Sequence, residues 1–434
     1  MVNLHPTIYV GTFVHCRDER ELEIIDSGVI DTHIHASQYP NAGVFGESTL
    51  LDWLNTYTFP LESSLRDLTK ARTVYRRCVS RTLAHGTTTA AYYATADVGS
   101  TNLLADICHA AGQRAFVGRC CMDALSPDYY KDASTEAAMD ATMATIAHMT
   151  QLDPSRDLVC PILTPRFAPS CTPATLTALG DLAHRHDLPI QTHMSENLPE
   201  CQLVRDLFPG YASYTAVYDH HRLLTPRTVL AHVVHVDDAE RELIARRGTG
   251  VSHCPVSNSA LGSGIARVRA LLDAGIKVGL GTDVSGGYSP SILEAARQAA
   301  LVSRLLPAVS SQVSASVGAV QGRAKTPDDN RAKLSIDEVL YLATHGGARL
   351  LGLERRVGAF KVGMEWDAQL VELGGVVSAL ETNAEGEEET SWMHNPISIF
   401  GNETWPDRIA KWFYSGDDRN TLRVWVRGKL VHQR

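Results

Sequence analysis

Short apolar runs rich in β-branched residues alternate along the chain with longer segments of helical periodicity. A strand buried on both faces appears as a nearly continuous apolar run, whereas an amphipathic helix repeats apolar residues every three or four positions. The runs predict strands at 27–35, 86–94, 114–122, 158–166, 189–196, 228–234, 248–255 and 277–284. Helical stretches such as TPATLTALGDLAHRH lie between them, and a helix-rich tract follows from about 290 to 352.

Eight strands, each followed by a helix, predict an α/β fold of the (β/α)8 TIM-barrel type over residues 27–359. Residues 1–26 and the β-rich segments within 360–434 predict a small β-sandwich domain formed from both chain ends. Two stretches, 307–333 and 381–391, are poor in apolar residues and are predicted to be surface insertions.

Composition narrows the class of partner. The chain has 434 residues and a formal net charge of −9, and this charge disfavours binding to a nucleic-acid backbone. The sequence has no apolar run of about 18 residues and no secretory leader pattern, so we expect no membrane span and no export. The nine cysteines are scattered, which favours a reducing, cytoplasmic setting. A small-molecule substrate is therefore the expected partner.

Two pairs of histidines share the spacing His-x-His. With 18 histidines in the chain, about one such pair is expected by chance. His33 and His35 fall in a predicted strand, where residues i and i+2 point to the same face and can bind one ion. His184 and His186 end a predicted helix, where the same spacing separates the side chains by about 200°. Only the strand pair is a candidate metal site.

Further metal-binding residue types stand at the carboxyl ends of other predicted strands. His193, His232 and Asp283 end the fifth, sixth and eighth strands. Barrel enzymes place their catalytic groups at this rim, and zinc prefers imidazole and carboxylate ligands. Any one of these residues taken alone is more often structural, but their shared position predicts one common site.

Several of these segments carry a resemblance to a known family. DTHIH, THMSE, LAH and GLGTD resemble the signature sites of the amidohydrolase superfamily. DTHIHASQYPNAG, YTFPLE, GQRAFVG, TPRFAPSC, HMSEN, VGLGTDVSGGYS and GDDRN closely resemble the guanine deaminase family within it. The resemblance implies a mononuclear zinc enzyme, commonly a homodimer, that hydrolyses guanine to xanthine and ammonia.

The resemblance also implies roles for individual residues. One Zn²⁺ per chain would be bound by His33, His35, His193 and Asp283. Catalysis would use Asp283 to take a proton from water, His232 to orient that water, and Glu196 to transfer protons to the ring and the leaving amine. The substrate contacts would be Gln38, Arg166 and Phe167 together with His193, Glu196 and His232.

Some of these residues could instead have ordinary structural roles, and other functions are possible. Glu196 could simply be a carboxylate at a helix start, and Arg166 and Phe167 could be an ordinary surface arginine and core phenylalanine. Relative to the family that the chain resembles, the N-terminal part of the small domain is shortened. Val256 and the segment SALGSG also depart from the family pattern, and these changes leave open another aminopurine, a pterin or a triazine as the substrate. A non-catalytic scaffold is the alternative from a different class, and such relatives are expected to lose metal ligands that this chain retains.

Overall fold

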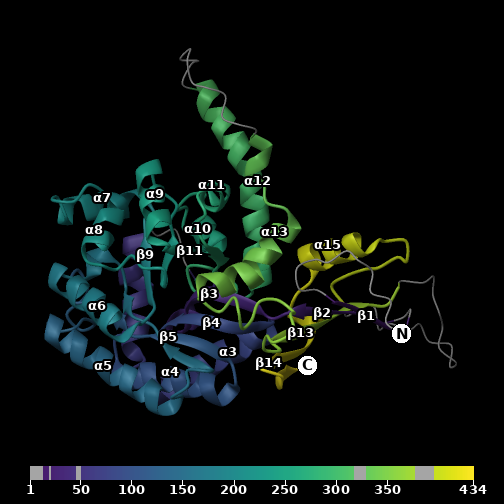
Figure 1. Ribbon diagram of the computed structural model, residues 1–434, viewed down its shortest axis with the longest axis horizontal. Coiled ribbons are helices and arrows are strands. Elements are labelled where there is room, and N and C mark those ends of the chain that lie inside the picture. Colours follow the sequence, from purple (N-terminus) through teal and green to yellow (C-terminus); the bar gives the residue numbers. More distant parts are fainter. Residues whose placement is uncertain (1–12, 19–20, 45–49, 317–328, 377–394) are drawn as a thin grey trace.

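The structure is a computed structural model that describes residues 13–18, 21–44, 50–316, 329–376 and 395–434. Two parallel sheets surrounded by helices form a large α/β body, and an antiparallel sheet lies beside it (Figure 1). Helix α12 extends away from this body in the same view. Among the described residues, no helix combines the length and apolar character needed to cross a membrane.

The first parallel sheet has the strand order β3-β4-β5-β7. Every residue of β3, β4 and β5 is buried, as expected for strands that are covered on both faces. The strands are β3 (Val29–His35), β4 (Thr87–Tyr93), β5 (Arg114–Gly118) and β7 (Val159–Pro161). The segments between them are η1 (Ala36–Asn41), α1 (Leu50–Trp53), η2 (Leu54–Thr58), α2 (Phe59–Ser64), α3 (Leu68–Ala84), α4 (Val98–Ala111) and α5 (Thr135–Leu152).

The second parallel sheet has the order β12-β11-β10-β9. Its strands are β9 (Ile190–Met194), β10 (Thr228–His232), β11 (Gly250–His253) and β12 (Val278–Leu280). The helices around it are α6 (Pro173–His186), α7 (Leu198–Leu207), α8 (Tyr214–His220), α9 (Asp238–Arg247), α10 (Pro255–Ala260) and α11 (Val268–Asp273). The tract after it contains α12 (Ile292–Ser316), η4 (Asp329–Ala332), α13 (Ile336–Tyr341), η5 (Leu342–Gly346) and α14 (Gly347–Leu350).

The two parallel sheets meet at both of their edges. On one side, Asp283 N donates to His33 O over 2.9 Å and His35 N donates to Val284 O over 3.1 Å. On the other side, Leu163 forms a parallel bridge with Ile190. The first and last strands of the α/β body are therefore neighbours, although about 245 residues separate them in sequence.

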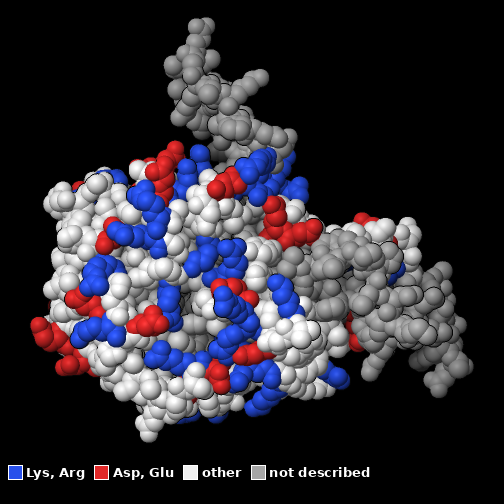
Figure 2. Space-filling model, viewed as in Figure 1, with Lys and Arg blue, Asp and Glu red and all other residues white. Residues whose placement is uncertain are grey.

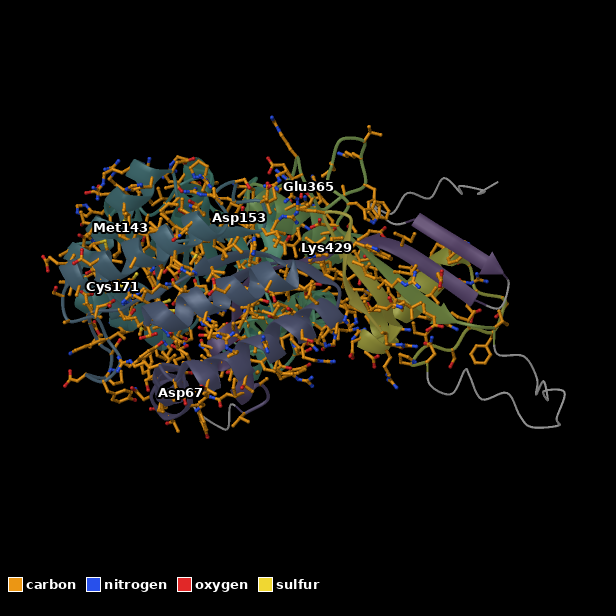
Figure 3. The ribbon with its side chains drawn as sticks, turned by 90° about the horizontal axis from the view of Figure 1, so that it is seen from below. Asp67, Met143, Asp153, Cys171, Glu365 and Lys429 are labelled. Atoms are coloured by element: carbon orange, nitrogen blue, oxygen red, sulfur yellow. The ribbon has the colours of Figure 1, made fainter. Side chains whose placement is uncertain are left out.

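The antiparallel sheet joins the two ends of the described chain. Its order is β1-β2-β13-β14-β15, with β1 (Phe13–Asp18), β2 (Glu21–Ser27), β13 (Ala368–Gly374), β14 (Thr421–Val426) and β15 (Lys429–Gln433). Helix α15 (Trp405–Ser415) packs Ile409 and Trp412 against Ile24 and Val371 of this sheet, and η7 (Asp418–Asn420) precedes β14. Figure 3 shows the sheet from a second side, with Glu365 and Lys429 where it adjoins the α/β body.

Each predicted strand overlaps a strand of the structure, but several bounds differ. The predicted strand 277–284 is observed as β12, which ends at Leu280, so Asp283 lies in the following loop. The predicted strands 114–122 and 158–166 are each divided, so that β6 (Cys120–Cys121) and β8 (Thr164–Pro165) form a separate short pair. Pro161 and Pro165 cannot donate a ladder hydrogen bond, which limits the length of β7 and β8. A short helix, η3 (Ala168–Ser170), follows β8.

The structure describes part of one predicted insertion and none of the other. The stretch 307–316 continues helix α12 to Ser316, so the first part of the predicted insertion 307–333 is helical. Residues 317–328 and the whole of 381–391 lie outside the described residues. The two-sheet sandwich stays a prediction, because the described part of that region forms one five-stranded sheet.

Helix α6 depends on a close approach at Gly180. Its N-terminus is as the sequence predicts, with Thr172 accepting from Thr175 N and Pro173 in the first turn. A Cβ atom on Gly180 would lie 2.0 Å from the carbonyl oxygen of His221, just after helix α8. The absent side chain therefore permits this helix contact.

We predict that Gly180→Ala destabilises the protein by about 1–3 kcal/mol, because overpacking outweighs the gain in helix propensity. Urea unfolding measures the change. Gly99→Ala in helix α4 is the matched control, since its nearest non-neighbouring atom would lie at 3.4 Å, and it should be neutral or stabilising. Equal effects of the two substitutions would contradict the packing argument.

Candidate active site

The candidate residues converge at the carboxyl ends of the parallel strands. His33 and His35 lie in β3, His193 lies in β9, and His232 is the last residue of β10. Asp283 follows β12 by three residues. Parallel strands end on the same rim of the α/β body, so residues far apart in sequence come within bonding distance there.

The backbone at this rim is unusual. Ser195, His232 and Asp283 adopt φ angles of 52°, 71° and 48°, in the left-handed region that side-chain-bearing residues seldom occupy. Such strain persists only where surrounding contacts enforce it, and it concentrates at functional sites. The chain thus turns sharply at the points where it presents these side chains.

Asp31, two residues before His33, secures the junction between β3 and the loop after β12. Its carboxylate accepts from Thr282 N over 3.1 Å, from Thr282 Oγ1 over 2.6 Å and from His33 N over 3.2 Å. Burial raises the pKa of Asp31 to about 7, although these hydrogen bonds lower it. This residue, which sequence reasoning assigned no role, therefore sets the relative position of His33 and Asp283.

Four of the rim side chains form a compact group of metal-ligating atoms. Ligand atoms of His33, His193, His232 and Asp283 all lie within 4.8 Å of one another. His33 Nε2 is 3.0 Å from Asp283 Oδ1. This donor set, three imidazoles and a carboxylate, suits a divalent transition metal.

The predicted ligand set included His35 and placed His232 outside the metal shell. His35 Nε2 lies 3.1 Å from His193 Nε2 and 3.4 Å from Asp283 Oδ1. His232 Nε2 lies farther from Asp283, at 3.7 Å from Oδ2. Ligand atoms on a tetrahedral zinc ion are separated by roughly 3.3–3.6 Å, so His35 fits the set as well as its neighbours do.

The hydrogen bonds of the histidines also fit a metal centre. His193 Nδ1 lies 2.6 Å from the carbonyl oxygen of Arg166, which requires the proton on Nδ1 and leaves Nε2 as a lone-pair donor. His33 Nδ1 is buried without a hydrogen-bond partner among the described residues, and His33 Nε2 faces Asp283 Oδ1. Burial lowers the pKa of His33, His35 and His193, which favours the neutral form that binds metal.

Glu196 and His232 face each other beside this group. His232 Nε2 is 3.6 Å from Glu196 Oε2, and His232 Nδ1 donates to Asn258 Oδ1 over 2.8 Å. Ser263 Oγ donates to Glu196 Oε1 over 3.0 Å. Burial raises the pKa of Glu196, with Asp283 adding to the effect and His232 opposing it, so this carboxyl group is suited to accept and release a proton.

A cavity of about 430 Å³ opens onto these residues. All predicted substrate contacts line it, along with apolar and polar residues that sequence reasoning missed. The lining comprises His35, Gln38, Trp53, Leu54, Arg166, Phe167, His193, Glu196, Glu200, His232, Leu261, Asp283 and Gly286.

The surroundings of Arg166 and Phe167 do not fit the alternative roles of a surface arginine and a core phenylalanine. Arg166 is 2% exposed, so it is not a surface arginine. Phe167 packs with Trp53, Leu54 and Phe59 in a small cluster beside the cavity, separate from the main core. Both side chains therefore belong to the wall of the site.

Neither histidine of the helical His-x-His pair lies in the cavity lining. His184 and His186 occupy the last turn of α6, as predicted. Burial raises the pKa of the Cys254 thiol far above its usual range, which argues against a thiolate nucleophile. Val256 packs into the main hydrophobic core, whereas in SALGSG Leu261 lines the cavity and Ser263 contacts Glu196. Of the two departures from the family pattern, only SALGSG reaches the site.

Comparison with known proteins decides the family. The model of the Amidohydrolase family matches residues 25–431. The chain belongs to the amidohydrolase family. A probable guanine deaminase of Schizosaccharomyces pombe is 50% identical over 412 residues, which cover 95% of this chain and 72% of the relative. Guanine deaminase of Homo sapiens is 41% identical over 94% of this chain and 83% of its own length.

A solved amidohydrolase structure extends this similarity to three dimensions. Guanine deaminase from C. acetobutylicum, crystallised with guanine in its active site, superimposes with a TM-score of 0.80 at 32% identity. The alignment covers 94% of this chain and 87% of that protein. The α/β architecture with its parallel sheets is therefore that of the amidohydrolases.

We predict that His193→Asn lowers the affinity for zinc, used as the probe metal, by at least about tenfold, because one imidazole ligand is lost. Competition with a chelator, followed by metal analysis, measures it. His184→Asn is the control, since this histidine has the same His-x-His spacing but lies at the end of a helix. Equal affinities of the two variants would show that the ion binds elsewhere.

Proposed function

We propose that this amidohydrolase hydrolyses guanine to xanthine and ammonia. One observation carries the proposal: a single cavity is lined both by Gln38 and Arg166, which can read a purine edge, and by the metal-ligating cluster with Glu196. Relatives at 41–50% identity over nearly the whole chain are named guanine deaminases. In this reaction a bond forms between C2 of guanine and the oxygen of water, and the bond between C2 and its amino group breaks.

We also propose the finer features of the fold. The bonds between β3 and the loop after β12, with the bridge between Leu163 and Ile190, support a closed (β/α)8 barrel over residues 27–359. The five-stranded sheet and helix α15 support a small second domain from residues 1–26 and 360–434. This division places the whole candidate site within the barrel.

The proposed cofactor is one zinc ion held by His33, His35, His193 and Asp283. The distances of 3.0–3.4 Å between their neighbouring donor atoms are short enough for these residues to hold one ion together. When bound, zinc lowers the pKa of a water molecule and so supplies a hydroxide nucleophile at neutral pH. Asp283 Oδ2, which lies 3.7 Å from His232 Nε2, would be the acceptor for the proton of the nucleophilic water.

Glu196 is proposed as the proton shuttle. It is 3% exposed and lies between His232 and Ser263, so bulk water does not compete for its proton. It protonates the purine ring as oxygen attacks C2, then takes the proton of the new C2 hydroxyl and transfers that proton to the departing amine. His232, fixed by Asn258, holds Nε2 toward the attacking oxygen and stabilises the charge that develops there.

Substrate recognition is assigned to three residues of the cavity wall. The Arg166 guanidinium donates hydrogen bonds to the O6 and N7 acceptors of guanine, as arginine does in other settings. The Gln38 amide offers a donor and an acceptor to the purine edge, and the Phe167 ring contacts its face. His193, Glu196 and His232 complete the contacts around C2.

We propose a cytoplasmic location, a small-molecule partner and a homodimeric assembly. Eight cysteines of the described chain are free thiols, which supports a cytoplasmic location. Basic and acidic side chains are interspersed on the face shown in Figure 2, which supports a small molecule rather than a nucleic acid as the partner. We propose a homodimer on the resemblance to the family alone.

The decisive test is ammonia release from a panel of aminated heterocycles by the purified, zinc-loaded chain. We expect turnover of guanine, with xanthine identified as the product by chromatography. Ammonia from another aminopurine, a pterin or a triazine but not from guanine would assign a different deaminase activity. No turnover and less than about one zinc per chain would support the non-catalytic scaffold.

Glu196→Gln is expected to retain zinc and lose turnover by a factor on the order of 10² or more, because the amide cannot shuttle protons. Steady-state kinetics and metal analysis of the same preparation measure both quantities. Wild-type turnover in this variant would remove Glu196 from the mechanism. Loss of zinc together with activity would instead indicate a structural role.

A further inference from the structure

A fully buried carboxylate lies behind the substrate-reading wall of the cavity. Glu62, in helix α2, is 0% exposed and is absent from the described residues that line the cavity. It accepts hydrogen bonds from Arg166 Nη1 over 2.7 Å and Nη2 over 3.3 Å, and from Gln38 Nε2 over 2.9 Å. Tyr130 and Ser37 hydroxyls complete its shell at 2.7 and 3.3 Å. One carboxylate thus joins both proposed purine-reading side chains.

We propose that Glu62 is a positioning and specificity-determining residue, which orients Arg166 and Gln38 for the 6-oxo edge of the purine. The inference rests on the proposed function. Glu62 does not touch the substrate in this account and acts only through the two residues it holds. Its contribution is therefore to discrimination between purines rather than to the chemistry at C2.

The geometry at Arg166 leaves a defined set of donors for the substrate. The guanidinium carries five N–H groups in one plane, and the paired contact of Nη1 and Nη2 with Glu62 fixes the orientation of that plane. The Phe59 ring, 5.2 Å from the guanidinium carbon, limits rotation out of it. The remaining N–H groups therefore point in directions set by Glu62.

Gln38 is oriented by the same carboxylate. Only the amide nitrogen can donate to Glu62, so the amide oxygen is held on the opposite side, 3.4 Å from both the backbone nitrogen and the hydroxyl of Ser285. A flipped amide would place two acceptor oxygens together. Glu62 therefore decides which end of Gln38 presents a donor and which presents an acceptor.

Charge balance gives Glu62 a second effect on the same wall. Arg166 and Glu62 side chains are 3% and 0% exposed, so solvent does not screen the guanidinium. The carboxylate neutralises this cation and makes the wall suited to a neutral purine with polar edges. Without it, an uncompensated buried cation would favour anions and would disturb the wall itself.

A purely structural role for Glu62 is the competing explanation, and a second buried pair provides the control. Arg114 and Asp367 form an ion pair with side chains 3% and 1% exposed, and Arg114 also contacts Glu365. Glu365 lies where the α/β body adjoins the antiparallel sheet (Figure 3). Arg114 begins β5, so this pair lies at the strand end opposite the catalytic rim.

The test compares guanine with 2-aminopurine, which lacks the 6-oxygen. We expect Glu62→Gln to raise KM for guanine on the order of 10- to 100-fold while the inhibition constant of 2-aminopurine changes less than about threefold. Zinc content should stay at the wild-type level. Asp367→Asn should lower thermal stability and leave the ratio of the two constants unchanged.

Each outcome decides the inference. Unchanged guanine KM in a folded Glu62→Gln protein would overturn it, as would an equal loss for both purines or a fall in kcat alone. If this variant does not fold, Glu62→Asp retains the charge with a shorter reach: a raised guanine KM supports the inference, and a wild-type KM overturns it. Absence of guanine turnover by the wild-type enzyme would instead overturn the proposed function as well.

Discussion

The candidate site depends on the hydrogen bonds between strand β3 and the loop that follows β12. Asp31 accepts hydrogen bonds from both Thr282 and His33, and Asp283 N donates to His33 O. These bonds fix the distance between the histidines of β3 and Asp283, which lie far apart in the sequence. The left-handed φ of Asp283 is tolerated because these bonds enforce it. A shift at this junction would alter the position of Asp283 relative to the histidines of both sheets.

Three buried carboxylates with different surroundings have different roles in the candidate site. Asp283 is surrounded by histidines, which hold its pKa below the usual range despite burial, so it remains an anion suited to a metal. Burial raises the pKa of Glu196, so this carboxyl group can carry a proton. Glu62 has a third role: its charge is balanced by Arg166, and it orients side chains that are proposed to recognise the substrate. The same side-chain chemistry thus serves binding, proton transfer and orientation.

Helices and connecting segments around the rim contribute further residues to the candidate site. Strand ends present the imidazoles and Asp283, yet Glu62 comes from α2 and Ser263 from the segment after α10. Trp53 and Leu54 add apolar surface from the short helical segments before α2. The segments outside the sheets therefore shape the pocket around a metal-ligating set that the sheets hold in place, as is usual for α/β enzymes.

The sequence alone predicted the strand and helix pattern and the metal-ligating residue types near strand ends, because strand periodicity and strand ends are local properties. The purine-reading candidates Gln38, Arg166 and Phe167 came from the resemblance to the guanine deaminase family. Only tertiary structure decided that Glu62 joins Gln38 to Arg166, that Ser263 and Asn258 hold Glu196 and His232, and that Val256 belongs to the core. These contacts link residues up to 104 positions apart through side-chain hydrogen bonds and packing. No periodicity encodes such pairings, since they arise only when separate elements pack together.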